Sequence, residues 1–162
     1  MLAPFIQEYI YDHGWIGLKD IQVQAVSAIL ESEDHVLISA GTASGKTEAA
    51  FFPILSKLYQ NEMDSFGVVY IGPLKALIND QFERISDLIK KAEIPLYAWH
   101  GDRPQREKKT AMRNPGGILQ ITPESLEALL MNHSGDLKRM FRQLQFIVID
   151  EIHAFMGTER GM

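Results

Sequence analysis

The chain has 162 residues, of which 46% are hydrophobic and 23% charged, with a formal net charge of −5 and no cysteine. This length and balance suit one globular domain with a hydrophobic core, and the missing thiols exclude disulfides and cysteine metal sites. No apolar stretch reaches the about 20 residues of a membrane span, and residues 1–10 do not resemble a signal peptide, so we expect a cytoplasmic protein.

The first part of the chain predicts two helices, a buried strand and a long third helix. Apolar residues recur at helical spacing from Pro4 to about His13 and from Asp20 to Glu31, where Asp20 is the expected cap. The apolar run from His35 to Ser39 predicts a strand, and helical spacing returns from Glu48 to about Tyr59.

The second part alternates short apolar runs with helical segments. Further strands are expected at residues 66–71, 95–99, 118–121 and 145–149. Helices are expected at 74–91, 103–113, 122–131 and 136–142, the first of them one continuous crossover. This alternation predicts an α/β fold, a parallel sheet covered by helices on both faces in three α/β/α layers. Ligands of such folds bind at the carboxyl ends of the strands.

A phosphate-binding loop lies between the strand that ends at Ser39 and the helix that follows. Its sequence from residue 40 is Ala-Gly-Thr-Ala-Ser-Gly-Lys-Thr, with alanine where such loops usually have their first glycine. Backbone N–H groups of small residues can wrap a triphosphate, and a helix start favours an anion. Lys46 would neutralise the β and γ phosphates, and the Thr47 hydroxyl would bind Mg²⁺. The candidate ATP-binding residues here are Gly41, Thr42, Ala43, Ser44, Gly45, Lys46 and Thr47.

Two carboxylates follow the last expected strand, in the sequence Asp150-Glu151-Ile152-His153. A carboxylate at the end of a buried strand can hold Mg²⁺, usually through water, and its neighbour can orient and deprotonate an attacking water. We expect Thr47 and Asp150 to hold the metal and Glu151 to act on the water. The candidate catalytic residues are therefore Lys46, Asp150 and Glu151. His153 alone is a weak signal, and the spacing of histidines and acids suggests no zinc site.

Four segments in this order resemble the first RecA-like domain of superfamily 2 DExD/H-box helicases. They are residues 40–47, Pro-Leu-Lys-Ala-Leu at 73–77, Thr-Pro-Glu-Ser-Leu at 122–126 and Asp-Glu-Ile-His at 150–153. The residues in these segments are most similar to the motifs of the large-helicase-related (Lhr-like) branch. The resemblance spans nearly the whole chain. It implies a RecA-like P-loop NTPase fold, ATP and Mg²⁺ as cofactors, and DNA or RNA as the partner.

The resemblance also implies a role for Gln22, which matches the adenine-reading glutamine that precedes the phosphate loop. A primary amide can donate to one edge of adenine and accept from the other. Gln24 is the neighbouring competitor, and Phe5 or Trp15 could supply an aromatic face. Taken alone, Gln22 would be a residue on the surface of its helix.

Further residues match motifs that lie against the nucleic-acid backbone in this family. They are Pro73, Lys75, Leu77, Gly101, Thr122 and Pro123, of which Gly101 is the loosest match. A loop that leaves a strand and enters a helix presents N–H groups and hydroxyls to phosphates without reading sequence. Thr122 and Pro123 also suit simple helix capping, and we expect both roles.

Most positive charge lies in the second half of the chain, because only Lys19, Lys46 and Lys57 precede Ser65. Its densest run consists of Arg103, Arg106, Lys108, Lys109 and Arg113. This run is either a solvated helix face or a nucleic-acid contact. In the second case binding should weaken steeply with added salt, because phosphate contacts release counterions.

The resemblance implies the ATP-binding motor domain of a helicase that couples hydrolysis to movement on, or unwinding of, nucleic acid. The chain ends soon after the Asp-Glu-Ile-His box, so we expect residues 1–162 to be a truncated first RecA-like domain. The second RecA-like domain and its arginine fingers are absent from this sequence. The chain alone should therefore bind ATP–Mg²⁺ and nucleic acid weakly, hydrolyse ATP slowly and separate no strands.

Three other functions fit parts of the sequence. A duplex DNA translocase that does not unwind would share this half of the motor. A small P-loop kinase fits the length, but Glu151 would supply the water activation that a kinase must avoid. A non-catalytic module could use ATP only to stabilise the fold, and Glu151→Gln would then leave phosphate release unchanged.

Overall fold

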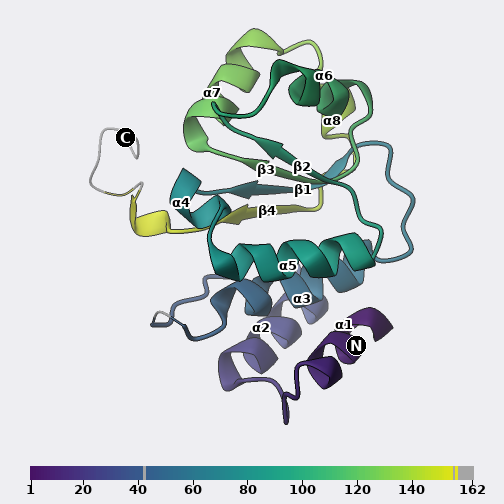
Figure 1. Ribbon diagram of the computed structural model, residues 1–162, viewed down its shortest axis with the longest axis vertical. Helices are drawn as coiled ribbons and strands as arrows, with labels where there is room; N and C mark the ends of the chain where they lie inside the picture. The colour runs from purple at the N-terminus through teal and green to yellow at the C-terminus, as the bar shows by residue number, and fades with distance from the viewer. Residues whose placement is uncertain (42, 155, 157–162) are drawn as a thin grey trace. The chain divides into compact units, whose positions relative to one another are not determined.

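The computed structural model describes residues 1–41, 43–154 and 156, which belong to two compact units (Figure 1). The first unit takes Met1–Asn61 and Glu83–Glu93, and the second takes Glu62–Phe82 and the chain from Ile94 onward. Helix α5 (Asp80–Lys91) begins in the second unit and continues in the first. Within the described ranges, the helices are all too short or too polar to cross a membrane.

Three helices build most of the first unit: α1 (Pro4–Asp12), α2 (Asp20–Glu31) and α3 (Lys46–Leu58). The buried ring of Tyr9 in α1 meets the buried ring of Phe52 in α3 edge to face, with centroids 5.9 Å apart. Such aromatic pairs add stabilisation beyond the apolar area that they bury. This packing fixes α3, and with it the loop that enters α3.

The strand expected from His35 to Ser39 is not formed, and these residues have no regular secondary structure. Val36 is 40% exposed and Leu37 is 78% exposed, although an apolar run predicts burial. A strand also needs a neighbour that takes up its backbone N–H and C=O groups. The described sheet does not include these residues, so apolar composition alone gave the wrong prediction here.

The second unit is built on a parallel sheet of four strands. They are β1 (Phe66–Ile71), β2 (Leu96–Trp99), β3 (Gly117–Ile121) and β4 (Phe146–Ile149), in the spatial order β2-β3-β1-β4. All pairs are parallel, and the last residues of the strands, Trp99, Ile121, Ile71 and Ile149, lie in one row of the ladder. The segments that follow the strands therefore meet at one edge.

Helices contact both faces of this sheet, as the sequence predicts. On one face lie α6 (Gln105–Arg113), α7 (Pro123–Asn132) and α8 (Leu137–Met140) (Figure 1). Their buried residues Ala111, Leu129 and Met140 join a core with Phe66, Val69, Trp99, Leu119 and Ile121. On the other face the ring of Tyr70 stacks on Phe82 with centroids 5.0 Å apart. The α/β class of the fold is confirmed.

The single helix expected over residues 74–91 is divided into α4 (Leu74–Leu77) and α5. Asn79 lies between them, and its Oδ1 accepts a hydrogen bond from the backbone N–H of Phe82 at 2.9 Å. Asparagine favours such a cap over a place inside a helix, because its side chain competes for backbone groups. The helical spacing of apolar residues continues across the break, so the sequence pattern does not indicate it.

Candidate functional site

The phosphate loop enters α3 through a left-handed glycine. Gly45 has φ +85, and a Cβ added to it would lie 2.5 Å from Nε2 of Gln22. The left-handed conformation favours glycine at this position, and a larger residue would have to displace the Gln22 amide. Ala43 also has a positive φ of 59, so the backbone curls before α3 begins at Lys46. Thr42, a candidate of the same loop, lies outside the described residues.

Two polar side chains of this loop bear on the predicted binding of an anion. The Lys46 ammonium donates to the carbonyl of Ala40 at 2.9 Å, which holds it against the loop. Among the described residues, the buried Ser44 Oγ has no hydrogen-bond partner. Such an unpaired buried atom calls for an explanation, and a ligand rich in oxygen would supply one. Thr47 lies half-buried in the first turn of α3, where backbone N–H groups are unpaired within the helix.

Gln22 lies beneath the loop and is fully buried. Its Oε1 accepts from the backbone N–H of Lys19 at 2.9 Å, and its Nε2 donates to the carbonyl of Gly45 at 3.4 Å. The Lys19 ammonium in turn donates to the carbonyl of Ala43 at 3.2 Å. Gln22 is thus no surface residue, whereas Gln24 is exposed. Lys19 was missed by the sequence analysis, although it stands directly before the helix that carries Gln22.

The aromatic residues proposed to accompany Gln22 pack within the first unit. The ring of Phe5 lies 4.9 Å from that of Tyr59, and the ring of Trp15 lies 6.1 Å from that of Phe52. Both side chains are half-buried. Each therefore has a structural role in the aromatic packing of this unit, whatever else it contacts.

In the second unit, Asp150 is positioned by hydrogen bonds to both carboxylate oxygens. Its Oδ2 accepts from the hydroxyl of Tyr70 at 2.5 Å, and its Oδ1 accepts from the N–H of Glu151 at 2.8 Å. Tyr70 is 1% exposed, and burial, followed by the nearby Asp150 charge, raises the pKa of its hydroxyl. Tyr70 is therefore a permanent donor to Asp150 at physiological pH. No motif in the sequence indicates Tyr70.

Glu151 leaves the strand direction with a left-handed backbone, φ +54. This region is uncommon for a residue with a side chain, and such strain gathers at functional sites. The Glu151 carboxylate lies 2.8 Å from Nε2 of the exposed His153. The three polar residues of the Asp-Glu-Ile-His box, Asp150, Glu151 and His153, thus lie together just beyond β4. His153, which is only a weak signal in the sequence, therefore contacts the carboxylate of Glu151.

The candidate nucleic-acid residues lie at the same carboxyl edge as Asp150. Gly72 follows β1, Gly101 is the second residue after β2, and Thr122 follows β3. A Cβ on Gly72 would lie 3.5 Å from the Asp150 Cβ, which shows how closely these segments approach. A Cβ on Gly101 would meet no atom within 4 Å, so there is open space beside this residue. Parallel pairing brings together motifs that are distant in sequence.

The side chains of these candidates differ in exposure. Lys75 is exposed, whereas Leu77 is 2% exposed and packs against the sheet. Thr122 occupies the cap position of α7, with Pro123 in the first turn, as predicted. Its hydroxyl does not cap a backbone N–H, however, and instead donates to Oγ of Ser125 at 3.0 Å. The prediction that Thr122 stands at the cap position is therefore confirmed. The prediction that its side chain caps the helix by a hydrogen bond is wrong.

The basic run lies on α6 and just before it, since Arg103 precedes the helix. Arg103 pairs with Glu107 at 2.5 Å, one turn along the chain, and both side chains are more than a third exposed. Surface pairs of this kind stabilise little. Arg106, Lys109 and Arg113 are also exposed. The structure is thus consistent with a solvated helix face, and the nucleic-acid contact of this run stays a prediction.

His100, directly after β2, should make the free energy of unfolding depend on pH. It is 9% exposed, and among the described residues its Nδ1 has no hydrogen-bond partner. Burial, and next the Arg103 charge, lower the pKa of the imidazole. The unfolded chain takes up a proton at about pH 6.5 and the folded chain only at lower pH, so the free energy of unfolding should fall below about pH 6.5.

Denaturant unfolding at several pH values would check this effect. His100→Gln should remove the part of the pH dependence that lies between about pH 6.5 and the lowered pKa, because glutamine does not titrate there. Above about pH 6.5 the difference between variant and wild type should stay constant. Equal pH dependence in both proteins across the whole range would contradict this assignment.

Asp150 in the second unit and Thr47 in the first each carry an oxygen donor of the kind that Mg²⁺ prefers. Within the described residues, no group of three or more acidic or histidine side chains could hold a metal. Mg²⁺ does not need such a cage, since it keeps several waters and is bound through one or two carboxylates and substrate phosphates. Asp150 supplies a carboxylate whose oxygens retain acceptor capacity beyond the bonds to Tyr70 and Glu151. Thr47 supplies a hydroxyl at the start of α3.

Comparisons with known proteins show the family to which this chain is related. The sequence model described as DEAD/DEAH box helicase matches residues 19–162. The ATP-dependent helicase Lhr-Core of Methanothermobacter thermautotrophicus is 33% identical over 100% of this chain and 20% of that protein. The Lhr helicase/uracil glycosylase of Escherichia coli is 32% identical over 87% of this chain and 10% of that protein.

Solved structures give the same result. The helicase Lhr of Mycobacterium smegmatis, bound to ssDNA and AMP-PNP, superposes with a TM-score of 0.80 at 28% identity, over 99% of this chain and 21% of that one. The chain therefore spans only 10% to 21% of the length of these three relatives. Their similarity to this chain concerns that one part of each protein.

Proposed function

The chain belongs to the DEAD/DEAH box helicase family, and from this premise we propose that it is the ATP-binding part of a nucleic-acid motor of the Lhr-like branch. In the whole protein, ATP hydrolysis would be coupled to movement on DNA or RNA, or to its unwinding. A second RecA-like domain elsewhere in that protein would be the partner of this one. A cytoplasmic location fits the composition, since the chain has no cysteine.

The observation that carries the proposal is the position of Lys46. Its ammonium already lies against the curled loop, on the carbonyl of Ala40, beside the start of α3. The ammonium has three donor hydrogens, so it can bind phosphate oxygens with those that Ala40 leaves free. The left-handed Gly45 lets the backbone pass close to the phosphates, and the helix start adds favourable partial charge.

The second half of the proposed site would act on the water that attacks the terminal phosphate. Thr47 and Asp150 would hold Mg²⁺, which neutralises the charge that develops on the phosphates. Tyr70 keeps the Asp150 carboxylate in one orientation through its hydrogen bond. Glu151 would orient the water and accept its proton, and the contact with His153 limits the directions in which its carboxylate can turn.

Nucleic acid would bind at the carboxyl edge of the sheet through its phosphates. Lys75 offers an exposed charge, and Gly101 is an exposed residue without a side chain, which a backbone phosphate could approach closely. Pro73, Thr122 and Pro123 would shape the loops that approach the strand. The Mycobacterium smegmatis relative was solved with ssDNA, which supports a single strand as the ligand of this edge.

Lys46→Ala tests the nucleotide part of the proposal. We expect the affinity of the chain for ATP–Mg²⁺ to fall by about 10- to 100-fold, because hydrogen bonds to charged groups are worth about 1.5 to 3 kcal/mol. Titration of a fluorescent ATP analogue into the purified chain measures the change. Lys91→Ala is the matched control, since it removes the same charge from an exposed position near the end of α5.

The control should bind nucleotide like the wild type, and both variants should retain the wild-type circular dichroism spectrum. Equal affinity in Lys46→Ala and the wild type would rule out the loop as the nucleotide site. Equal losses in both lysine variants would mean that net charge, and no particular site, controls binding.

A further inference from the structure

One polar side chain interrupts the otherwise apolar strand β3. Gln120 is 5% exposed and stands between the fully buried Leu119 and Ile121. Its register partners are Tyr70 in β1 and Ala98 in β2, so its side chain projects from the same face of the sheet as Tyr70. A buried polar group costs free energy unless it has a hydrogen-bond partner. The amide of Gln120 therefore needs a partner on that face.

That partner is the last residue of α4. The Nε2 of Gln120 donates to the backbone carbonyl of Leu77 at 2.5 Å. The last carbonyl groups of a helix have no partner within the helix, so a side chain that donates to one of them fixes the helix end. The beginning of the same segment is also tied to β3, because the N–H of Gly72 donates to the carbonyl of Ile121 at 3.3 Å. Two consecutive residues of β3 thus hold both ends of the segment 72–77.

The single turn of α4 buries Leu77 and leaves Lys75 exposed. A Cβ added to Gly72 would lie 3.3 Å from Cδ2 of Leu77, so the turn packs closely on the residue that enters it. Figure 1 shows α4 at the end of the sheet where α7 begins, just after Thr122. The hydrogen bond from Gln120 therefore controls where Lys75 stands relative to Thr122.

We propose that Gln120 is a positioning residue of the nucleic-acid edge, which sets the distance between Lys75 and Thr122. Both of these residues are candidates for contact with the nucleic-acid backbone, and backbone contacts fix the register of a strand on the protein. A segment that is already held in its bound position binds more tightly, because less conformational freedom is lost on binding. This inference rests on the proposed binding of nucleic acid at this edge, and it adds a buried residue that does not touch the ligand.

Fluorescence anisotropy with a labelled single-stranded oligothymidine tests the proposal in the purified chain at low salt. Gln120→Met keeps a similar length but has no donor, so it should weaken binding about two- to fivefold, as the direct loss of charge in Lys75→Gln should. Each phosphate contact of a single strand contributes about 0.7 to the slope of log affinity against log salt concentration. Both variants should therefore lower that slope, by about 0.7 where the contact is lost completely, whereas a loss of stability alone leaves the slope unchanged.

The double variant Gln120→Met/Lys75→Gln shows whether the two residues act through one contact. Because each single change then removes the same contact, the double variant should bind as weakly as the weaker single variant and no more weakly. Independent contributions would multiply to a loss of about four- to 25-fold. Such a multiplied loss would overturn the proposal.

Hydrogen exchange of the free chain shows whether Gln120 holds α4. The N–H of Ile78, which donates to the carbonyl of Leu74 at 3.1 Å, should exchange faster in Gln120→Met than in the wild type. Gln120→Leu is a second variant without the donor, makes β3 apolar throughout and should show the same increase. Wild-type exchange of α4 in both variants would contradict the proposal without any nucleic acid in the experiment.

Ile118→Val is the matched control, since it removes one fully buried methyl group from the same strand and leaves the donor to Leu77 in place. It should lower the free energy of unfolding without a change in oligothymidine affinity or salt slope. Unchanged affinity in Gln120→Met, together with a loss in Lys75→Gln, would overturn this inference and leave the proposed function standing. Unchanged affinity in Lys75→Gln would overturn the proposed nucleic-acid edge, and this inference with it.

Discussion

Gly117→Ala is expected to destabilise the chain by about 3 kcal/mol or more, an effect that reaches the large end for single substitutions. Gly117 opens β3 with φ +65, and a Cβ there would lie 2.1 Å from the carbonyl oxygen of Pro95. That oxygen accepts the N–H of Ile118 at 2.9 Å, so it cannot move away without the loss of a backbone hydrogen bond between neighbouring segments. The left-handed conformation adds about 1 to 2 kcal/mol of its own.

Gly14→Ala separates the two contributions. Gly14 has the same φ of +65, but a Cβ added to it would meet no atom within 4 Å. Its substitution should therefore cost only the conformational part, about 1 to 2 kcal/mol. Denaturant unfolding of both variants gives the cost of the contact with Pro95 as the difference between them. A cost for Gly117→Ala that does not exceed that of Gly14→Ala would refute the clash.

Much of this fold could be predicted because its strands are short apolar runs between helical segments, an alternation that allows few topologies. The strands at residues 66–71, 95–99, 118–121 and 145–149 are confirmed within one residue at each end. The RecA-like fold is confirmed by the solved relatives, and the resemblance to the Lhr-like branch by the Lhr helicases. Ordered motifs carried that resemblance, and they need no knowledge of packing.

The wrong predictions concern features that apolar patterns do not contain. Residues 35–39 have the composition of a strand but no pairing partner in the described sheet. The break in the helix over residues 74–91 depends on one hydrogen bond of Asn79. Tyr70 was missed because only the pairing of β1 with β4 brings it to Asp150, and no local pattern shows which strands are neighbours.

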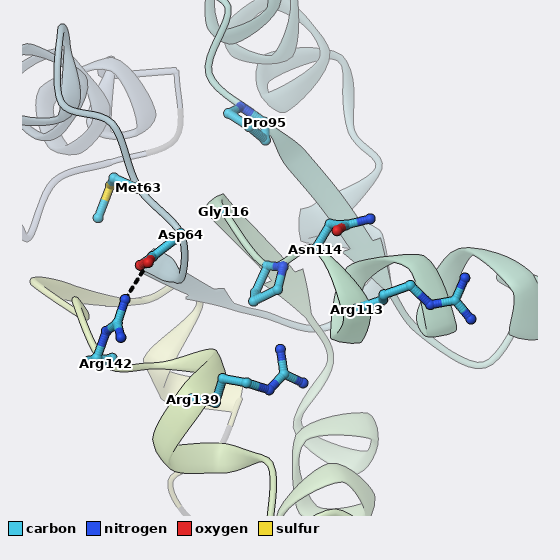
Figure 2. A pocket seen from close by; sticks show the side chains of 9 residues that line it. Met63, Asp64, Pro95, Arg113, Asn114, Gly116, Arg139 and Arg142 are labelled. Carbon is cyan, nitrogen blue, oxygen red and sulfur yellow. Dashed lines mark hydrogen bonds and ion pairs between the residues drawn. The ribbon is translucent and has the colours of Figure 1, made fainter.

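The ion pair between Asp64 and Arg142 (Figure 2) could not be predicted for the same reason. Asp64 and Arg142 are distant in sequence, and the sheet brings them into one ion pair. The basic run at residues 103–113 is the densest in the sequence, yet neither member of this ion pair belongs to it. Charge clusters in a sequence thus identify a helix face, whereas a binding site depends on which other segments reach that face.

Glu151→Gln is expected to slow ATP hydrolysis by about 10²- to 10⁴-fold, the usual contribution of a general base. Glutamine has the size of glutamate and keeps an acceptor oxygen, but it cannot take a proton from water. It also adds no backbone cost to the left-handed position of residue 151, φ +54. The affinity for ATP–Mg²⁺ should therefore remain, in contrast to Lys46→Ala.

Single-turnover release of the labelled terminal phosphate measures this loss, with the same preparation tested for nucleotide binding. Glu127→Gln, on an exposed position of α7, removes the same charge away from the site and should not change either quantity. Unchanged phosphate release in Glu151→Gln would exclude this carboxylate as the base and leave a module that binds nucleotide without acting on it. A parallel loss of affinity would instead mean that Glu151 supports the binding site, since a proton acceptor acts only after ATP is bound.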